Sequence, residues 1–187
     1  MVFYRIMKTM RFGPSTRAGP ASSTDRRTLL KVGAMLSGLC VAGTRSVAAE
    51  PALLTIRTPD GESHRIGEQD LALLDWHEVR TQTAWTSGVH VFRGPLLRDV
   101  LALASTDPAL RTGRLDMRAI NDFEVTVPAR DAWDHHPILA RTMDGQMMRV
   151  RDKGPLWLVY PRDDNPHLQT AEFDERWIWQ LSEIAIR

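Results

Sequence analysis

The stretch RDKGPLWLVYP, residues 151–161, places a charged turn directly before a nearly continuous apolar run. Strands buried on both faces carry apolar residues at successive positions, whereas half-exposed strands alternate. Residues 155–161 are therefore predicted to form a strand in the interior of the domain. The charged residues 151–154 are then expected at the mouth where that strand begins.

Shorter strands and few helices are predicted around this run. Turn residues indicate hairpins at Pro59-Asp60-Gly61, at Asn121-Asp122 and at Asp144-Gly145. The strands expected lie within residues 52–66, 114–120, 123–128 and 137–150, with others at 76–85 and 178–187. Leucine and valine at helical spacing predict a helix over 95–104, with a short helix at 69–74 and a helical turn at 129–134. Many short strands with few helices indicate the α+β class.

Residues 1–49 have the parts of a cleaved export signal: basic residues, an apolar core at 32–43, and the small residues Ser46-Val47-Ala48-Ala49. The pair Arg26-Arg27 is typical of the bacterial twin-arginine route, which carries folded cargo. An ordinary export signal with two chance arginines is the alternative. The core is shorter than the roughly 20 residues that span a bilayer, so we expect cleavage near Ala49, no permanent membrane anchor and a periplasmic location.

Charge and cysteine content restrict what residues 50–187 can do. The leader holds eight of the 24 Lys+Arg and one of the 23 Asp+Glu, which leaves 16 against 22 and a formal charge of −6. An acidic domain without a basic cluster is not expected to bind nucleic acid. The single cysteine of the chain, Cys40, lies in the leader, so residues 50–187 contain no thiol. Disulfides, thiolate metal ligands and cysteine nucleophiles are thereby excluded from this part of the chain.

No motif in residues 50–187 predicts a metal site or a hydrolase. The histidines, His64, His77, His90, His135, His136 and His167, stand at no metal-ligand spacing. The sequence also lacks a G-x-S-x-G elbow and a glycine-rich phosphate loop. We therefore predict no metal held by the protein and no catalytic residues of these types.

Five segments in order carry a resemblance to a known family. They are FRGPLLRDVL (92–101), AINDFEVTVP (119–128), MDGQMM (143–148), RDKGPLWLVYP (151–161) and WQLSEIAI (179–186). Together they resemble the molybdopterin-binding domain of the sulfite oxidase family, in its small bacterial single-domain form, over about residues 53–187. The resemblance implies the sulfite oxidase fold, with mixed β-sheets, few short helices and a bound pterin. A domain built around a cofactor also has reason to be exported already folded.

The chain departs from that family at one position. Family enzymes bind molybdenum through the pterin dithiolene and one protein cysteine, in a segment that here reads RTQTAWTSG (80–88). Only Thr, Gln and Thr occupy residues 81–83, and a hydroxyl is a poorer ligand than a thiolate for a soft metal. Molybdenum and family-type catalysis are thus not expected. Relatives without this cysteine bind pterins in the periplasm and relay their presence to a membrane signalling protein.

Tryptophans are the first candidate pterin contacts. All six tryptophans of the chain lie in residues 50–187, and a flat pterin needs aromatic faces. Trp85 directly follows the position of the missing cysteine, and the pair Arg176-Trp177 could flank a ligand. A rim or core tryptophan is the alternative for Trp85, and a plain surface strand is the alternative for Arg176 and Trp177.

Polar candidates come from two turns. Asn121 and Asp122 could pair with the aminopyrimidine edge, since a carboxylate accepts hydrogen bonds from a ring N–H and its amino group together. At the mouth of the interior strand, Gly154 would let the backbone approach the ligand. Lys153 and Arg151 could there meet a phosphate or hydroxylated tail. The alternative in both places is an ordinary exposed turn.

These features predict a periplasmic pterin-binding protein that is non-catalytic and acts as a ligand sensor for a membrane signalling partner. The pterin would be a tetrahydropterin or a molybdopterin-like molecule. The alternative is a molybdenum-molybdopterin oxidoreductase with a non-cysteine metal ligand, which would act on a small oxyanion or sulfoxide with an electron-transfer partner. A third possibility is an interaction module whose pocket has collapsed.

Overall fold

The structure is a computed structural model, and it describes residues 51–187. The predicted export signal of residues 1–49 lies outside the described residues. Mixed β-sheets with a few short helices form the described domain, which confirms the predicted α+β class. Within residues 51–187, no helix is both long enough and apolar enough to cross a bilayer.

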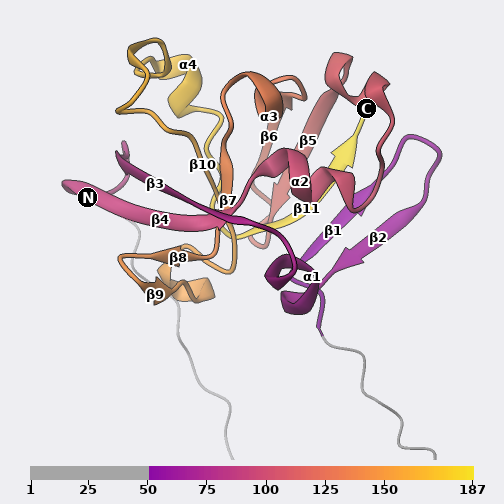
Figure 1. Ribbon diagram of the computed structural model, residues 1–187, viewed down its shortest axis with the longest axis horizontal. Helices are drawn as coiled ribbons and strands as arrows, with labels where there is room; N and C mark the ends of the chain where they lie inside the picture. Colours follow the sequence, from indigo (N-terminus) through magenta and orange to yellow (C-terminus); the bar gives the residue numbers. More distant parts are fainter. Residues whose placement is uncertain (1–50) are drawn as a thin grey trace, which may run out of the picture. The chain divides into compact units, whose positions relative to one another are not determined.

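Short elements follow one another along the domain (Figure 1). The strands are β1 (Leu54–Arg57), β2 (Ser63–Ile66), β3 (Trp76–Gln82), β4 (Val89–Pro95), β5 (Arg114–Ala119), β6 (Glu124–Pro128), β7 (Ile138–Ala140), β8 (Thr142–Met143), β9 (Gln146–Met147), β10 (Trp157–Val159) and β11 (Leu181–Ile186). The α-helices are α1 (Glu68–Ala72), α2 (Leu97–Ala102), α3 (Asp131–Asp134) and α4 (Ala171–Asp174). The 3₁₀ helices are η1 (Pro108–Thr112), η2 (Val150–Asp152) and η3 (Pro166–Leu168).

The largest sheet has the strand order β2-β1-β11-β5-β6. Its centre is β11, which runs parallel to β1 and antiparallel to β5. The hairpins β1-β2 and β5-β6 form at the turns predicted from the sequence, where Gly61 and Asp122 have φ values of +90° and +64°. Glycine and aspartate tolerate this left-handed conformation better than most residues. The sheet therefore brings the last strand of the chain against the first.

Two smaller sheets complete the domain (Figure 1). In the four-stranded sheet, β3 and β4 form a long antiparallel ribbon, and the short β8-β9 hairpin pairs with β4. In the two-stranded sheet, β10 pairs with β7, and both strands are buried along their whole length. The predicted interior strand is thus confirmed, although it is shorter than residues 155–161.

Two predicted elements have different bounds in the structure. The helix expected over 95–104 is the shorter α2. It begins only at Leu97, because Pro95 still pairs with Trp76 in the β-ribbon and Leu96 forms a bridge with Ile138. The hairpin expected over 137–150 is only the two-residue pair β8-β9, because β7 leaves it to pair with β10. Strand β4, helix α4 and the 3₁₀ helices were not predicted.

Gly94 lies where β4 passes closest to β7. A Cβ atom at position 94 would lie 2.0 Å from the carbonyl oxygen of Leu139, closer than packed atoms come. The backbone N–H of Arg141 donates to the carbonyl of Arg93 at 2.8 Å beside this contact. The ribbon and the two-stranded sheet are therefore joined by backbone, and glycine is the residue that fits.

We expect Gly94→Ala to lower the free energy of unfolding by about 3 kcal/mol, since the added methyl meets backbone that has no room to move. Gly61→Ala is the matched control, because nothing lies within 4 Å of its Cβ position. That control should cost only about 1 kcal/mol, for the strained φ. Urea unfolding of both variants measures the difference, and equal losses would contradict the close contact at Gly94.

Candidate functional site

A cavity of about 620 Å³ opens beside strand β6. This volume falls within the roughly 300–1,000 Å³ of small-molecule sites. The walls come from the turn between β5 and β6, from β6 itself, from the loop after β3 and from the segment that follows α4. Its lining residues are Trp85, Asn121, Phe123, Glu124, Val125, Thr126, Glu175, Trp177 and Trp179.

Three indole rings form one side of this cavity. The ring centroid of Trp85 lies 5.5 Å from that of Trp179 and 5.8 Å from that of Trp177, with the planes inclined at 65° and 46°. Behind them lies the fully buried Trp157, 6.0 Å from Trp177. Trp177 is 1% exposed, and its indole Nε1–H has no hydrogen-bond partner among residues 51–187. The arrangement presents aromatic surface to the cavity from the half-buried Trp85 and Trp179, with Trp177 packed beneath.

The structure brings three of the predicted site residues together. Trp85, Asn121 and Trp177 all line the cavity, although they are far apart in the sequence. Phe123, Glu124, Glu175 and Trp179 also line it and were not predicted. Trp179 lies in an apolar run that gives no sign of a ligand contact, and the two glutamates carry no local pattern that separates them from solvated charges. Only the tertiary fold reveals them.

Lys153 lies beside the aromatic cluster rather than in the cavity lining. Its Nζ atom is 4.3 Å from the ring centroid of Trp179 and 5.3 Å from that of Trp157. Burial lowers the pKa of Lys153, because a charged ammonium loses hydration there. The side chain covers apolar ring surface and contributes a cation-π contact. Its position supports the tryptophans that line the cavity.

Asp122, Arg151 and Gly154 do not line the cavity. Asp122 is an exposed turn residue whose backbone N–H donates to Ala119 at 3.1 Å. Arg151 is exposed and 3.5 Å from the carboxylate of Asp152. A Cβ at position 154 would lie 2.2 Å from the carbonyl oxygen of Met148, so glycine there allows two chain segments to approach. The close approach that was predicted for a ligand is thus made by the protein backbone.

Arg176 turns away from the cavity into a buried ion pair. Its Nη1 donates to Asp131 at 2.7 Å, and the hydroxyl of Tyr160 donates to the same carboxylate oxygen at 3.0 Å. Glu172 accepts a second hydrogen bond from the guanidinium, which also lies 4.1 Å from the Phe173 ring centroid. Asp131 is 1% exposed. The contacts join α3 to α4, so Arg176 fixes the segment that carries Trp177.

The network determines the protonation of its members. Burial acts to lower the pKa of Arg176, but the hydrogen bond and charge of Asp131 raise it above the usual value. Burial, reinforced by the charge of Asp131, raises the pKa of Tyr160 well above its usual value. Arg176 therefore stays charged and Tyr160 stays a hydrogen-bond donor at neutral pH.

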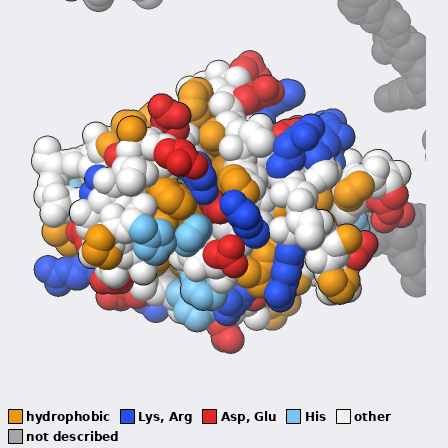
Figure 2. Space-filling model, turned by 90° about the horizontal axis from the view of Figure 1, so that it is seen from above, with side chains coloured by type: hydrophobic (Ala, Val, Ile, Leu, Met, Phe, Trp, Pro, Cys, Tyr) orange, Lys and Arg blue, Asp and Glu red, His pale blue; other side chains and the backbone are white. Residues whose placement is uncertain are grey.

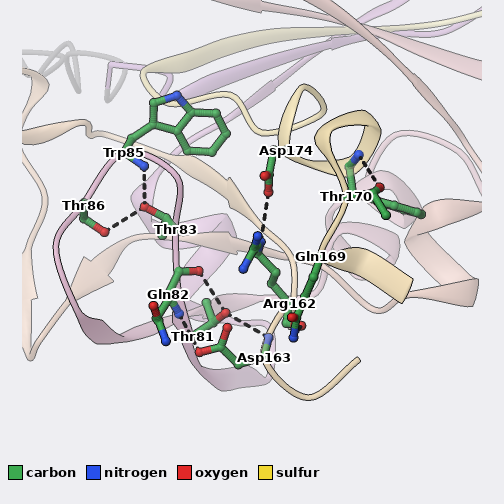
Figure 3. A network of polar contacts seen from close by, with 11 residues as sticks. Thr81, Gln82, Thr83, Trp85, Thr86, Arg162, Asp163, Gln169, Thr170 and Asp174 are labelled. Atoms are coloured by element: carbon green, nitrogen blue, oxygen red, sulfur yellow. Dashed lines mark hydrogen bonds and ion pairs between the residues drawn. The ribbon is translucent and has the colours of Figure 1, made fainter. Parts of the chain in front are cut away.

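The segment in which the family cysteine would lie is held by hydrogen bonds within the protein (Figure 3). The Thr81 hydroxyl donates to the Gln82 carbonyl at 3.1 Å and accepts from the backbone N–H of Asp163 at 3.2 Å. The carboxylate of Asp163 accepts from the backbone N–H of Gln82 at 2.9 Å. Thr81 is also completely buried. This hydroxyl is therefore not free to replace a thiolate at a metal.

The hydroxyl of Thr83 is likewise held by hydrogen bonds within the protein (Figure 3). Its hydroxyl lies 2.7 Å from that of Thr86 and accepts from the backbone N–H of Trp85 at 3.1 Å. These bonds fix the loop that presents Trp85 to the cavity. The residues present thus do not fit a molybdenum ion bound through position 81 or 83, whereas the cavity fits a flat organic ring.

Histidines gather on one face of the molecule (Figure 2). His135 Nδ1 and His167 Nε2 lie 3.4 Å apart, and His135 Nε2 lies 3.9 Å from the buried Asp131 carboxylate. Within residues 51–187, no three His, Cys, Asp or Glu side chains are grouped so that they could hold a metal ion. The histidine pair therefore borders the Asp131 network on its solvent side.

Comparison with known proteins bears on the fold alone. No protein-family model matches the chain, and no curated protein matches it significantly. The chain is similar in structure to the sulfane dehydrogenase SoxCD from Paracoccus pantotrophus, with a TM-score of 0.52 and 18% sequence identity. The match covers 71% of this chain and 37% of that chain. The described domain thus shares the fold of a part of that enzyme.

We expect Asp131→Asn to lower the free energy of unfolding by about 3 kcal/mol, because it removes the buried member of the ion pair and leaves Arg176 with the exposed Glu172 as its ionic partner. Asp134→Asn, an exposed change in the same helix, is the control and should cost less than about 0.5 kcal/mol. Chemical denaturation measures both. Similar values for the two variants would show that the ion pair does not stabilise the fold.

We expect the pH dependence of stability to contain a contribution from His135. Burial lowers its pKa below 6.5, opposed by Asp131 and Asp134 and assisted by His167 and Arg176. The unfolded chain then binds the proton first, so the stability present above pH 6.5 is lost as the pH falls through this value.

Thermal melts of the wild type and of His135→Asn between about pH 8 and pH 5 test this sign. The melting temperature of the wild type should fall more steeply than that of the variant. A steeper fall in His135→Asn than in the wild type would contradict the direction of the pKa shift.

Proposed function

We propose that residues 50–187 form a periplasmic pterin-binding domain of the sulfite oxidase type, which binds its ligand without catalysis and reports it to a membrane signalling protein. The observation that carries the proposal is the cavity walled by Trp85, Trp177 and Trp179. A bicyclic pterin needs flat faces to stack on and polar groups for its amide and amino edge. The cavity offers both, because Asn121 and two glutamates lie in the same lining.

The hydrogen bonding of the β3 loop supports binding without catalysis. Residues 51–187 contain no thiol, and the hydroxyls of Thr81 and Thr83 bond to the protein itself. A molybdenum enzyme of this type needs a soft protein ligand at that place. The same loop retains Trp85, so the segment keeps the contact with the flat ring while it lacks the contact with the metal.

The fold supports the assignment to the sulfite oxidase type. The structural likeness to a sulfane dehydrogenase agrees with the five family-like segments of the sequence. Trp85 lies in the segment 80–88, where the resemblance places the metal ligand, and Asn121 and Trp179 lie in two of the five family-like segments. The likeness also keeps the molybdenum oxidoreductase as the second candidate function, because that neighbour is an enzyme.

A route for the signal is available next to the cavity. Trp177 lines the cavity, whereas its neighbour Arg176 anchors the same segment to Asp131 in α3. A ligand that moves Trp177 acts on the end of α4 and on the surface around it. Transmission requires that the ligand bind one conformation of this segment more tightly than another. We propose that the partner distinguishes these conformations at the surface of α4.

We expect 6-hydroxymethylpterin to raise the melting temperature of the purified protein and to quench its tryptophan fluorescence. At about 100 times its dissociation constant, the ligand should add about 2.7 kcal/mol to the free energy of unfolding. Trp85→Leu should weaken binding at least about tenfold, because base-stacking contacts of this kind contribute about 1–3 kcal/mol. Trp133→Leu changes an indole outside the cavity and should leave the affinity unchanged.

Metal analysis of protein isolated from a bacterial periplasm tests the non-catalytic part. We expect denaturation to release free pterin into the supernatant, and the same sample to contain less than about 0.1 molybdenum atom per chain. Close to one molybdenum per chain would overturn this part and favour the oxidoreductase. Absence of any pterin effect on stability would instead favour a pure interaction module.

A further inference from the structure

The charged residues of the tryptophan cavity are all acidic. Among the lining residues, Glu124 and Glu175 carry charge, and neither lysine, arginine nor histidine is present. Residues 50–187 as a whole carry a formal charge of −6, from 16 basic and 22 acidic residues. An anionic group that entered this cavity would face these two carboxylates, whereas Arg118 is paired with Glu124 and Lys153 packs on the rings of Trp157 and Trp179. The cavity is therefore built for the neutral or positive edge of a ligand.

The two glutamates differ in what they already contact. Glu124 on β6 accepts a hydrogen bond from Arg118 Nε at 2.9 Å, so its charge is balanced. The carboxylate of Glu175 has neither a hydrogen bond nor an ion pair with any of residues 51–187. Its backbone is fixed at the end of α4, where its N–H donates to Ala171 at 3.0 Å. Glu175 thus presents a free carboxylate from an anchored position.

A pterin offers such a carboxylate two donors side by side. The ring N3–H and the 2-amino group lie on one edge, and both oxygens of a carboxylate can accept from them at the same time. The half-buried rings of Trp85 and Trp179 supply aromatic surface in the same lining, and the buried Trp177, two residues after Glu175, packs against Trp85.

We infer that Glu175 binds the aminopyrimidine edge of the ligand and that the cavity selects a pterin whose tail carries no phosphate or carboxylate. The inference rests on the proposed pterin-binding function and names the chemistry of the ligand at that site. It separates an uncharged pterin from a phosphorylated, molybdopterin-like one. Glu175 determines specificity through hydrogen bonding, whereas the charge of Glu124 is balanced by its Arg118 partner.

Two matched ligand pairs test this inference by isothermal titration calorimetry. 6-Hydroxymethylpterin and pterin-6-carboxylate differ in the charge of the tail. 6-Hydroxymethylpterin and 6-hydroxymethyllumazine differ at position 2, where lumazine has an oxygen instead of the amino group. The wild type should bind 6-hydroxymethylpterin at least about tenfold more tightly than either analogue. The lumazine lacks the amino group that donates a charge-assisted hydrogen bond to Glu175, and the tail of the carboxylate is repelled by the acidic lining.

Glu175→Gln should reduce the affinity for 6-hydroxymethylpterin about tenfold or more. The affinity of this variant for 6-hydroxymethyllumazine should stay within about threefold of the wild-type value. The ratio of its affinities for 6-hydroxymethylpterin and pterin-6-carboxylate should be smaller than in the wild type. The exposed Glu175 has no described side-chain partner, so the variant should keep the wild-type melting temperature. Glu78→Gln removes the same charge from β3, outside the cavity lining, and should change none of the three constants.

The outcomes separate the inference from the proposed function. If 6-hydroxymethylpterin binds, but the carboxylate or the lumazine binds the wild type equally well, the inference is wrong while pterin binding stands. Unchanged constants in Glu175→Gln would also overturn it. If none of the three compounds binds, both the proposed function and the inference fail.

Discussion

Burial of the run 156–160 is the constraint on which the rest of the domain depends. All five of its side chains are inaccessible to solvent. Strand β10 within this run pairs with β7 and forms a bridge through Trp157 to Trp179. The Trp157 ring packs 5.3 Å from Phe92 of β4 and 6.0 Å from Trp177. One apolar strand therefore connects the β-ribbon with the indole wall, and each large side chain that it buries contributes about 1.5–3 kcal/mol.

After α4, a residue that stabilises the fold lies between residues of the proposed ligand site. Arg176 pairs with Asp131 and is part of the frame, whereas Glu175 and Trp177 on either side of it line the cavity. The loop after β3 shows the same division. Thr81 and Thr83 are bound within the protein, and Trp85, two residues further on, reaches the cavity. The frame residues are thus held by contacts within the protein, and the cavity-lining residues lie directly beside them.

The sequence predicted those parts of the fold that local patterns determine. The structure confirmed the buried strand predicted within 155–161 and the turns at Pro59-Asp60-Gly61 and Asn121-Asp122. Both kinds of feature depend on the types of residues that are adjacent in the sequence. The bounds of α2 were not predictable in this way, since tertiary pairing of β4 with β3 keeps Pro95 extended. Helix spacing alone contains no information on that competition.

The candidate site was predictable to a smaller extent. Trp85, Asn121 and Trp177 were predicted from residue type, and Trp85 also from its place after the missing cysteine, and all three line the cavity. Arg176 has the residue type expected of a ligand contact, yet in the structure it is paired with the buried Asp131. Glu124 and Glu175 were missed, because a glutamate in a sequence shows its charge but not which wall it faces.

The grouping of the tryptophans gives the domain a characteristic optical behaviour. Four of the six indoles, Trp85, Trp157, Trp177 and Trp179, lie in one cluster with centroid distances of 5.5–6.2 Å. At such separations the electronic transitions of the rings couple, and excitation passes readily from one ring to the next. The contribution of these four rings to the near-ultraviolet circular dichroism and to the emission is therefore a shared property of the cluster. A change in the orientation of one ring alters the contribution of its neighbours as well.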